Sequence, residues 1–142
     1  MNVRIVYYSD SGNTKKLAMA VSEAAGVPAE EMTGRPELDS VDLLFVGGSV
    51  RAFSLEKNCK EFLKSLKDSQ AKNVALFSTS GFGKGISKFA AKILKGTGIH
   101  LIPEECAVRG GENKKTGETH PDDKDCEKAK EFAKRMVERV SA

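Results

Sequence analysis

The chain has 142 residues, of which 39% are hydrophobic and 30% charged, with 23 Lys and Arg against 20 Asp and Glu. This length is too short for two good cores and predicts a single domain over residues 1–142. No apolar run approaches the ~18 residues of a membrane span, and the first residues lack a signal-peptide pattern, so we expect a cytoplasmic protein without a membrane partner. Cys59, Cys106 and Cys126 lack C-x-x-C spacing, which favours isolated thiols over a disulfide framework or zinc site.

Strand and helix patterns alternate along the chain. The run 3–8 is apolar at odd and even positions, as expected of a strand buried on both faces of a parallel sheet. Further strands are predicted at 27–32 (a weak edge strand), 41–46, 74–77 and 99–108, the last interrupted by Pro103. Apolar residues at helical spacing predict helices within 15–25, 55–66, 86–94 and 126–140. Right-handed crossovers then give a doubly wound α/β fold, a five-stranded parallel sheet of order 2-1-3-4-5 with helices on both faces.

The segment between the first strand and the first helix is built to hold an anion. Hydroxyl, carboxamide and glycine residues fill positions 9–14, directly before the exposed amides of a helix N-terminus. Neither the Walker pattern nor G-x-G-x-x-G is present, which argues against a nucleoside triphosphate or a dinucleotide and leaves a mononucleotide. The alternative is that these residues are ordinary turn and capping residues with nothing bound.

The sequence Ser-Asp-Ser-Gly-Asn-Thr of this segment resembles the flavodoxin phosphate loop, [ST]-x-[ST]-G-N-T, at every defined position. The resemblance covers nearly the whole chain, which looks like a short-chain member of the family. It implies that the 5′-phosphate of FMN is bound by residues of this loop, with Asp10 at the free position: Ser9, Asp10, Ser11, Gly12, Asn13 and Thr14.

The loop expected after the third strand starts with the pair Gly47-Gly48. Flavodoxins place here a loop that touches the reactive edge of the isoalloxazine, commonly through a backbone group that reorients with redox state. The resemblance therefore implies FMN contacts from Ser49, Val50, Arg51, Ala52 and Phe53. Paired glycines after a strand can also simply mark a tight turn, and this alternative stays open.

The loop after the fourth predicted strand, Ser-Thr-Ser-Gly-Phe-Gly-Lys-Gly at 78–85, resembles the flavodoxin pattern G-S-x-G-[WY]-G-D. The resemblance implies that this loop also lines the FMN site, through Thr79, Ser80, Gly81, Phe82, Gly83 and Gly85. Phe82 would stack on the flavin face. Alternatively, Phe82 folds back onto the following helix as a core residue.

Two features depart from the family pattern. Lys84 stands where the family has an acid, and Arg51 adds a cation on the opposing loop. Positive charge near the flavin would favour the anionic reduced ring. The basic balance also raises nucleic acid as a partner, but the lysines are spread along helix faces and no aromatic base-stacking platform is present, so we expect no nucleic-acid binding.

These observations predict an FMN-binding electron carrier, a monomer that exchanges electrons with redox protein partners. No catalytic residue and no metal ligand is assigned. A receiver domain is disfavoured by Gly47-Gly48 at the end of the third strand, and a low-molecular-weight phosphatase by the lack of cysteine in the first loop. Two alternative functions remain. The second choice is a flavodoxin-fold binding or regulatory module without FMN, and the third is a small FMN-dependent reductase.

Overall fold

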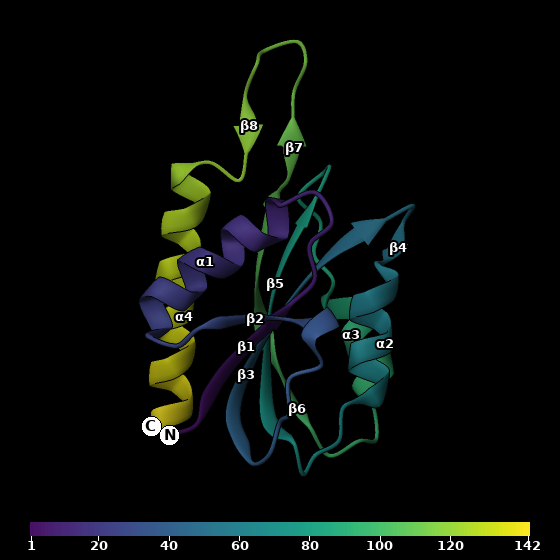
Figure 1. Ribbon diagram of the computed structural model, residues 1–142, viewed down its shortest axis with the longest axis vertical. Coiled ribbons are helices and arrows are strands. Elements are labelled where there is room, and N and C mark those ends of the chain that lie inside the picture. The colour runs from purple at the N-terminus through teal and green to yellow at the C-terminus, as the bar shows by residue number, and fades with distance from the viewer.

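The computed structural model, which describes residues 1–142, is a sheet covered by helices on both faces (Figure 1). Its parallel strands lie in the order β2-β1-β3-β5-β6, which is the order predicted from the sequence. Their bounds are Val3–Tyr7 for β1, Ala29–Glu31 for β2, Val41–Arg51 for β3, Ala71–Ser80 for β5 and His100–Arg109 for β6. Two features were not predicted: β4 (Ser54–Leu55) pairs antiparallel with β3, and β7 (Gly111–Glu112) pairs with β8 (Thr119–His120) in a separate hairpin.

The helices divide between the two faces of the sheet (Figure 1). Helices α1 (Asn13–Ala25) and α4 (Asp123–Ser141) close one core, in which the rings of Phe45 and Phe132 meet edge to face at 6.1 Å. Helices α2 (Lys57–Ser65) and α3 (Ser87–Leu94) close the other, and a short 3-10 turn, η1 (Met32–Gly34), packs beside α2. Two cores explain why the central strands are apolar at odd and even positions. No helix combines the length and apolar character needed to cross a membrane.

Strand β3 extends beyond its predicted end at residue 46, so Gly47 and Gly48 lie in the strand and not in a loop. A Cβ at Gly47 would overlap the ring of Phe77, its cross-strand partner on β5, and one at Gly48 would lie 2.6 Å from the Cys59 sulfur. The turn interpretation of this pair was therefore wrong. The glycines make room for side chains of the two cores. Strand β5 is likewise longer than the predicted 74–77.

The interruption predicted at Pro103 is a change of register. Val74 pairs with Leu101, but Leu76 pairs with Glu105, so β6 contains extra residues around the proline. Proline has no N–H to donate to a ladder, and a bulge on an edge strand accommodates it. One further boundary was wrong: Leu55 belongs to β4, and α2 starts at Lys57.

All three thiols are free. Burial raises the pKa of Cys59 to about 12 and that of Cys106 to about 11, so both are protonated at neutral pH. Cys126 is half-buried beside the α1–α4 core, and burial also raises its pKa. These environments agree with structural roles for the cysteines.

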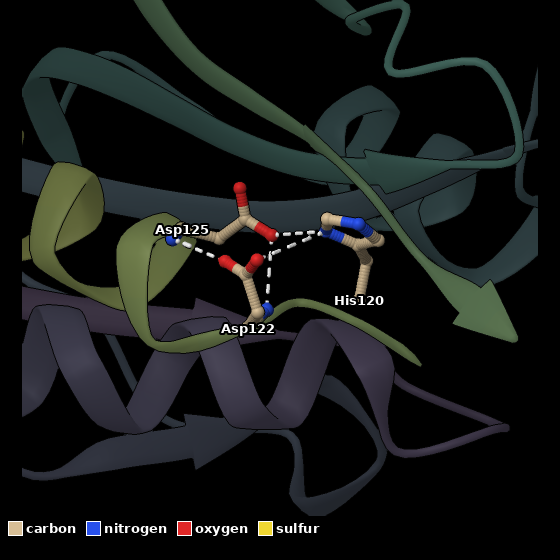
Figure 2. Close-up of side chains that lie close together, drawn as sticks. All are labelled: His120, Asp122 and Asp125. Carbon is tan, nitrogen blue, oxygen red and sulfur yellow. Dashed lines mark hydrogen bonds and ion pairs between the residues drawn. The ribbon is translucent and has the colours of Figure 1, made fainter. Parts of the chain in front are cut away.

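The start of α4 is fixed by a reciprocal cap (Figure 2). Asp122 accepts a hydrogen bond from the Asp125 amide at 2.9 Å, and the Asp125 carboxylate accepts one from the Asp122 amide at the same distance. His120 Nδ1 lies 2.7 Å from the Asp125 carboxylate and 3.8 Å from that of Asp122. The cap and His120 together account for this cluster of side chains as a helix start.

We expect the cap to make part of the folding stability depend on acid pH. The hydrogen bond from the Asp125 amide lowers the pKa of Asp122 below its usual value, and His120 acts in the same direction. The stabilisation is therefore complete above the unfolded-state pKa of about 3.9 and disappears as the pH falls through the lower folded-state value. Denaturant melts of wild type and Asp122→Asn should differ most near neutrality and converge in acid. A difference that stays constant down to about pH 2 would contradict this origin.

Candidate functional site

A cavity of about 320 Å³, lined mostly by polar residues and glycines, opens at the carboxyl ends of β1, β3, β5 and β6. Ligands of doubly wound sheets bind at this edge, next to the point where the strand order reverses. The cavity is lined by Ser11, Asn13, Ser49, Val50, Arg51, Thr79, Ser80, Gly81, Gly110 and Gly111. The sequence predicts all of these as site residues except the last two. Folding therefore brings members of all three predicted loops to one cavity.

The loop between β1 and α1 presents an uncapped helix N-terminus to this cavity. Gly12, with a φ of 91°, is the N-cap residue, and no side chain caps the helix or places an acid in its first turn. The Gly12 N–H donates to Ser9 Oγ at 3.1 Å, which closes the loop on itself. The amides of the first turn are consequently left for an external anion.

Thr14 is held inside the protein. Its side chain is 2% exposed, and its Oγ1 lies 2.9 Å from Thr79 Oγ1 at the end of β5. This contact ties the loop between β1 and α1 to the sheet, and it leaves the backbone N–H as the group that Thr14 can offer to an anion. The structure thus gives Thr14 a positioning role that the loop motif alone does not reveal.

Gly110, which the sequence reading missed, lets the end of β6 approach the same loop. A Cβ there would lie 3.1 Å from the Thr79 Cβ and 3.2 Å from the Asn13 Cβ, and the Gly110 N–H donates to the Ser80 carbonyl at 2.9 Å. The available signal was a second pair of glycines, 110 and 111, directly after a predicted strand. Such a pair indicates close approach as well as a turn.

Asp10 and Arg51 form an ion pair that joins the loop after β1 to the end of β3. Both side chains are half-exposed. The flavodoxin motif leaves the position of Asp10 free, so the pairing could not be read from the sequence. Asp10 compensates the charge of Arg51. Lys84 is therefore the one cation without an ion-pair partner in the three segments predicted to form the site, 9–14, 47–54 and 78–85.

The turn between β3 and β4 is strained and carries an exposed ring. Arg51 pairs with Ser54, so Ala52 and Phe53 form a two-residue turn with φ values of 49° and 65°. Such a turn favours Asn and Gly, and a bulky residue with positive φ costs of order 1 kcal/mol or more. Phe53 is 91% exposed, so no core contact offsets this cost. Strain of this kind concentrates at binding sites.

Phe82 is the second exposed ring at this edge, 82% exposed between Gly81 and Gly83. The alternative that Phe82 packs into the core is therefore wrong. The loop that carries it is closed by the Ser80 hydroxyl, which donates to the Lys84 carbonyl at 3.0 Å. Ala52, Phe53, Phe82 and Gly83 do not line the cavity, and their contact with a ligand stays a prediction.

Glycine is required at position 85 because of its contact with Glu105. The Glu105 carboxylate accepts hydrogen bonds from Ser78 Oγ at 2.7 Å and from the amides of Ile86 and Ser87 at 2.7 and 3.1 Å. A Cβ at Gly85 would overlap this carboxylate. Glu105, on strand β6, thus caps the start of α3, and no local sequence pattern predicts this arrangement.

Comparison with known proteins agrees with this geometry. The family model of the flavodoxin domain matches residues 4–111. An uncharacterized protein of Methanocaldococcus jannaschii is 28% identical over 96% of this chain and 99% of its own. Among solved structures, a flavodoxin from the domain Archaea has a TM-score of 0.80 at 24% identity, covering 100% of both chains. Oxidised Flavodoxin 2 from Bacillus cereus has a TM-score of 0.72 at 20% identity, covering 98% of this chain and 99% of that one.

The two solved structures share the fold, while the family model carries the assignment because it spans most of the chain, including all three loops that meet at the cavity. The strand order, the uncapped helix at the first loop and the rings at the cavity edge are consistent with it. The chain belongs to the flavodoxin domain family, whose members bind FMN.

Proposed function

We propose that this flavodoxin-type electron carrier binds FMN in the cavity at the carboxyl edge of the sheet and, as a monomer, shuttles electrons between redox proteins. The observation that carries the proposal is the uncapped N-terminus of α1, which opens onto a cavity also lined by Arg51 and Gly81, near the exposed Phe53 and Phe82 in sequence. When bound, FMN supplies the redox chemistry, and the protein supplies orientation and electrostatics.

The residues present fit a flavin mononucleotide. The first-turn amides of α1, with Ser9, Ser11 and Asn13, would hold the phosphate without a lysine or a metal. Thr79, Ser80 and the glycines at the ends of β5 and β6 would line the ribityl chain. The exposed rings of Phe53 and Phe82 would cover the faces of the isoalloxazine, which offsets their cost of exposure.

Titration of flavin-free protein with FMN tests the proposal. We expect quenching of flavin fluorescence at one FMN per chain at micromolar protein, with no comparable binding of FAD or NAD, because the loop suits one terminal phosphate. Absence of quenching would favour the module without FMN. Turnover of a quinone or nitro compound by the loaded protein with a nicotinamide donor would instead favour the reductase.

We expect Lys84→Asp to lower the one-electron potential at which bound FMN becomes fully reduced. Lys84 is exposed and has no ion-pair partner, so its charge is free to stabilise an anionic reduced flavin. Each ~1.4 kcal/mol of differential stabilisation moves a one-electron couple by about 60 mV, and solvent screening keeps an exposed side chain below that figure. A redox titration beside Lys92→Asp, the same charge change near the C-terminus of α3, measures the effect. Equal shifts in both variants would mean that Lys84 points away from the ring.

A further inference from the structure

The hairpin β7–β8 projects from the cofactor edge of the molecule (Figure 1). Residues 111–119 are all exposed, and none of them is apolar apart from glycine. Backbone hydrogen bonds of 2.8 Å from Asn113 to Glu118 and from Gly117 to Asn113 order the tip, and Asn113 Oδ1 accepts from the Lys115 amide at 3.0 Å. The chain thus builds an ordered arm that contributes nothing to either core.

The base of the arm is fixed beside the cofactor cavity. Lys16, in the first turns of α1, donates to the carbonyl of the buried Pro121 at 2.5 Å, and His120 is bonded to Asp125 at the start of α4 (Figure 2). On the other side, Gly110 packs against Asn13 and Thr79. The arm is therefore anchored to the loop proposed to hold the phosphate, and its position relative to the cavity is set.

Four cations without ion-pair partners belong to the arm or to the segments next to it. They are Lys114 and Lys115 in the arm, Arg109 at the end of β6 and Lys84 in the loop after β5, and we call them the basic arm. The Arg109 side chain lies against Gly83, next to the exposed Phe82. Beneath the arm, a wholly polar cavity of about 280 Å³ shares Gly81, Gly110 and Gly111 with the cofactor cavity. The acids of the hairpin are Glu112 and Glu118, so the four cations of the basic arm outnumber them.

This arrangement is suited to a partner that must come close to the flavin edge. Unpaired surface charges steer association and set orientation, and rates gain 10–10³-fold from complementary charge. The positive charge of this surface favours a partner that presents carboxylates to it. Nucleic acid fits less well, because the arm has no aromatic residue on which a base could stack.

We propose that the basic arm is the docking surface for a small electron-transfer protein with an acidic face. The proposal rests on the proposed function, since the docked protein gives one electron to the FMN-loaded chain and is itself oxidised by one electron. Docking places its redox centre beside the cavity edge where Phe82 lies.

The experiment uses FMN-loaded protein and a reduced, acidic [2Fe–2S] ferredoxin as the electron donor, followed by stopped-flow absorbance. The test variant is Lys114→Glu/Lys115→Glu, and the matched control is Lys92→Glu/Lys95→Glu, the same charge change at the far end of α3. Neither pair of lysines lines the cofactor cavity. FMN affinity and flavin potential are measured for each protein, so failure to bind FMN, which would defeat the proposed function, is recognised separately.

We expect the second-order rate of wild type to fall as salt rises, and the arm variant to lose about tenfold at low salt with unchanged FMN affinity. The control should lose less than about twofold. Equal losses in both variants, or a wild-type rate that does not fall with salt, would overturn the proposal. So would tight binding of a DNA or RNA duplex that blocks the reaction with ferredoxin, since the arm would then serve nucleic acid.

Discussion

Replacing Phe82 with alanine is expected to weaken FMN binding by tenfold or more and to leave the stability of the flavin-free protein almost unchanged. The ring is 82% exposed, so truncation opens no cavity in a core. Its contribution arises only when a ligand covers it: burial of a phenylalanine side chain is worth about 1.5–3 kcal/mol, and stacking adds about 0.5–1.5 kcal/mol. Tenfold in affinity corresponds to about 1.4 kcal/mol.

FMN titrations and denaturant melts of the same flavin-free proteins measure the two quantities. Phe82→Trp should retain FMN binding because it keeps an aromatic face. The control is Met19→Ala, which truncates an exposed apolar side chain on α1 and should change neither FMN affinity nor stability. If Phe82→Ala bound FMN as tightly as wild type, the ring would have to lie away from the flavin.

The fold could be predicted from the sequence because its signals are local and repeated. Runs such as residues 43–46 are apolar on both faces, as expected of a sheet covered by helices on both sides, and short connections then restrict the strand order. The first loop was equally readable, since hydroxyl, amide and glycine residues stand in fixed order before a helix. Here local sequence and global structure agree.

The parts that could not be predicted depend on contacts between distant segments. Asp10 meets Arg51 across the edge of the sheet, and Glu105 caps a helix from the neighbouring strand. Neither residue has a local reason to be an acid. The hairpin formed by Gly111–Glu112 and Thr119–His120 was missed because its polar strands bury nothing, so they carry no hydrophobic period.

Strand ends were misplaced for a related reason. Glycine ordinarily marks the end of a strand, yet Gly47 and Gly48 lie inside β3, opposite large side chains of each core. What the sequence shows at this point is the absence of a side chain, and the neighbour that needs the space, Phe77 for Gly47 and Cys59 for Gly48, is visible only in the fold.

We therefore expect Gly47→Ala to destabilise the protein strongly. The added methyl group would overlap the ring of Phe77, which is fully buried and cannot move aside without displacing its core. Overpacking of this kind costs about 1–3 kcal/mol of unfolding free energy, occasionally more. Gly34→Ala is the matched control, because a Cβ there meets no atom within 4 Å, and it should change stability by less than about 0.5 kcal/mol. Denaturant melts of flavin-free proteins measure both.

The double variant Gly47→Ala/Phe77→Leu should lose less unfolding free energy than the two single variants lose together, since the smaller side chain leaves room for the methyl group. Strict additivity, or a harmless Gly47→Ala, would show that the ring is not the constraint.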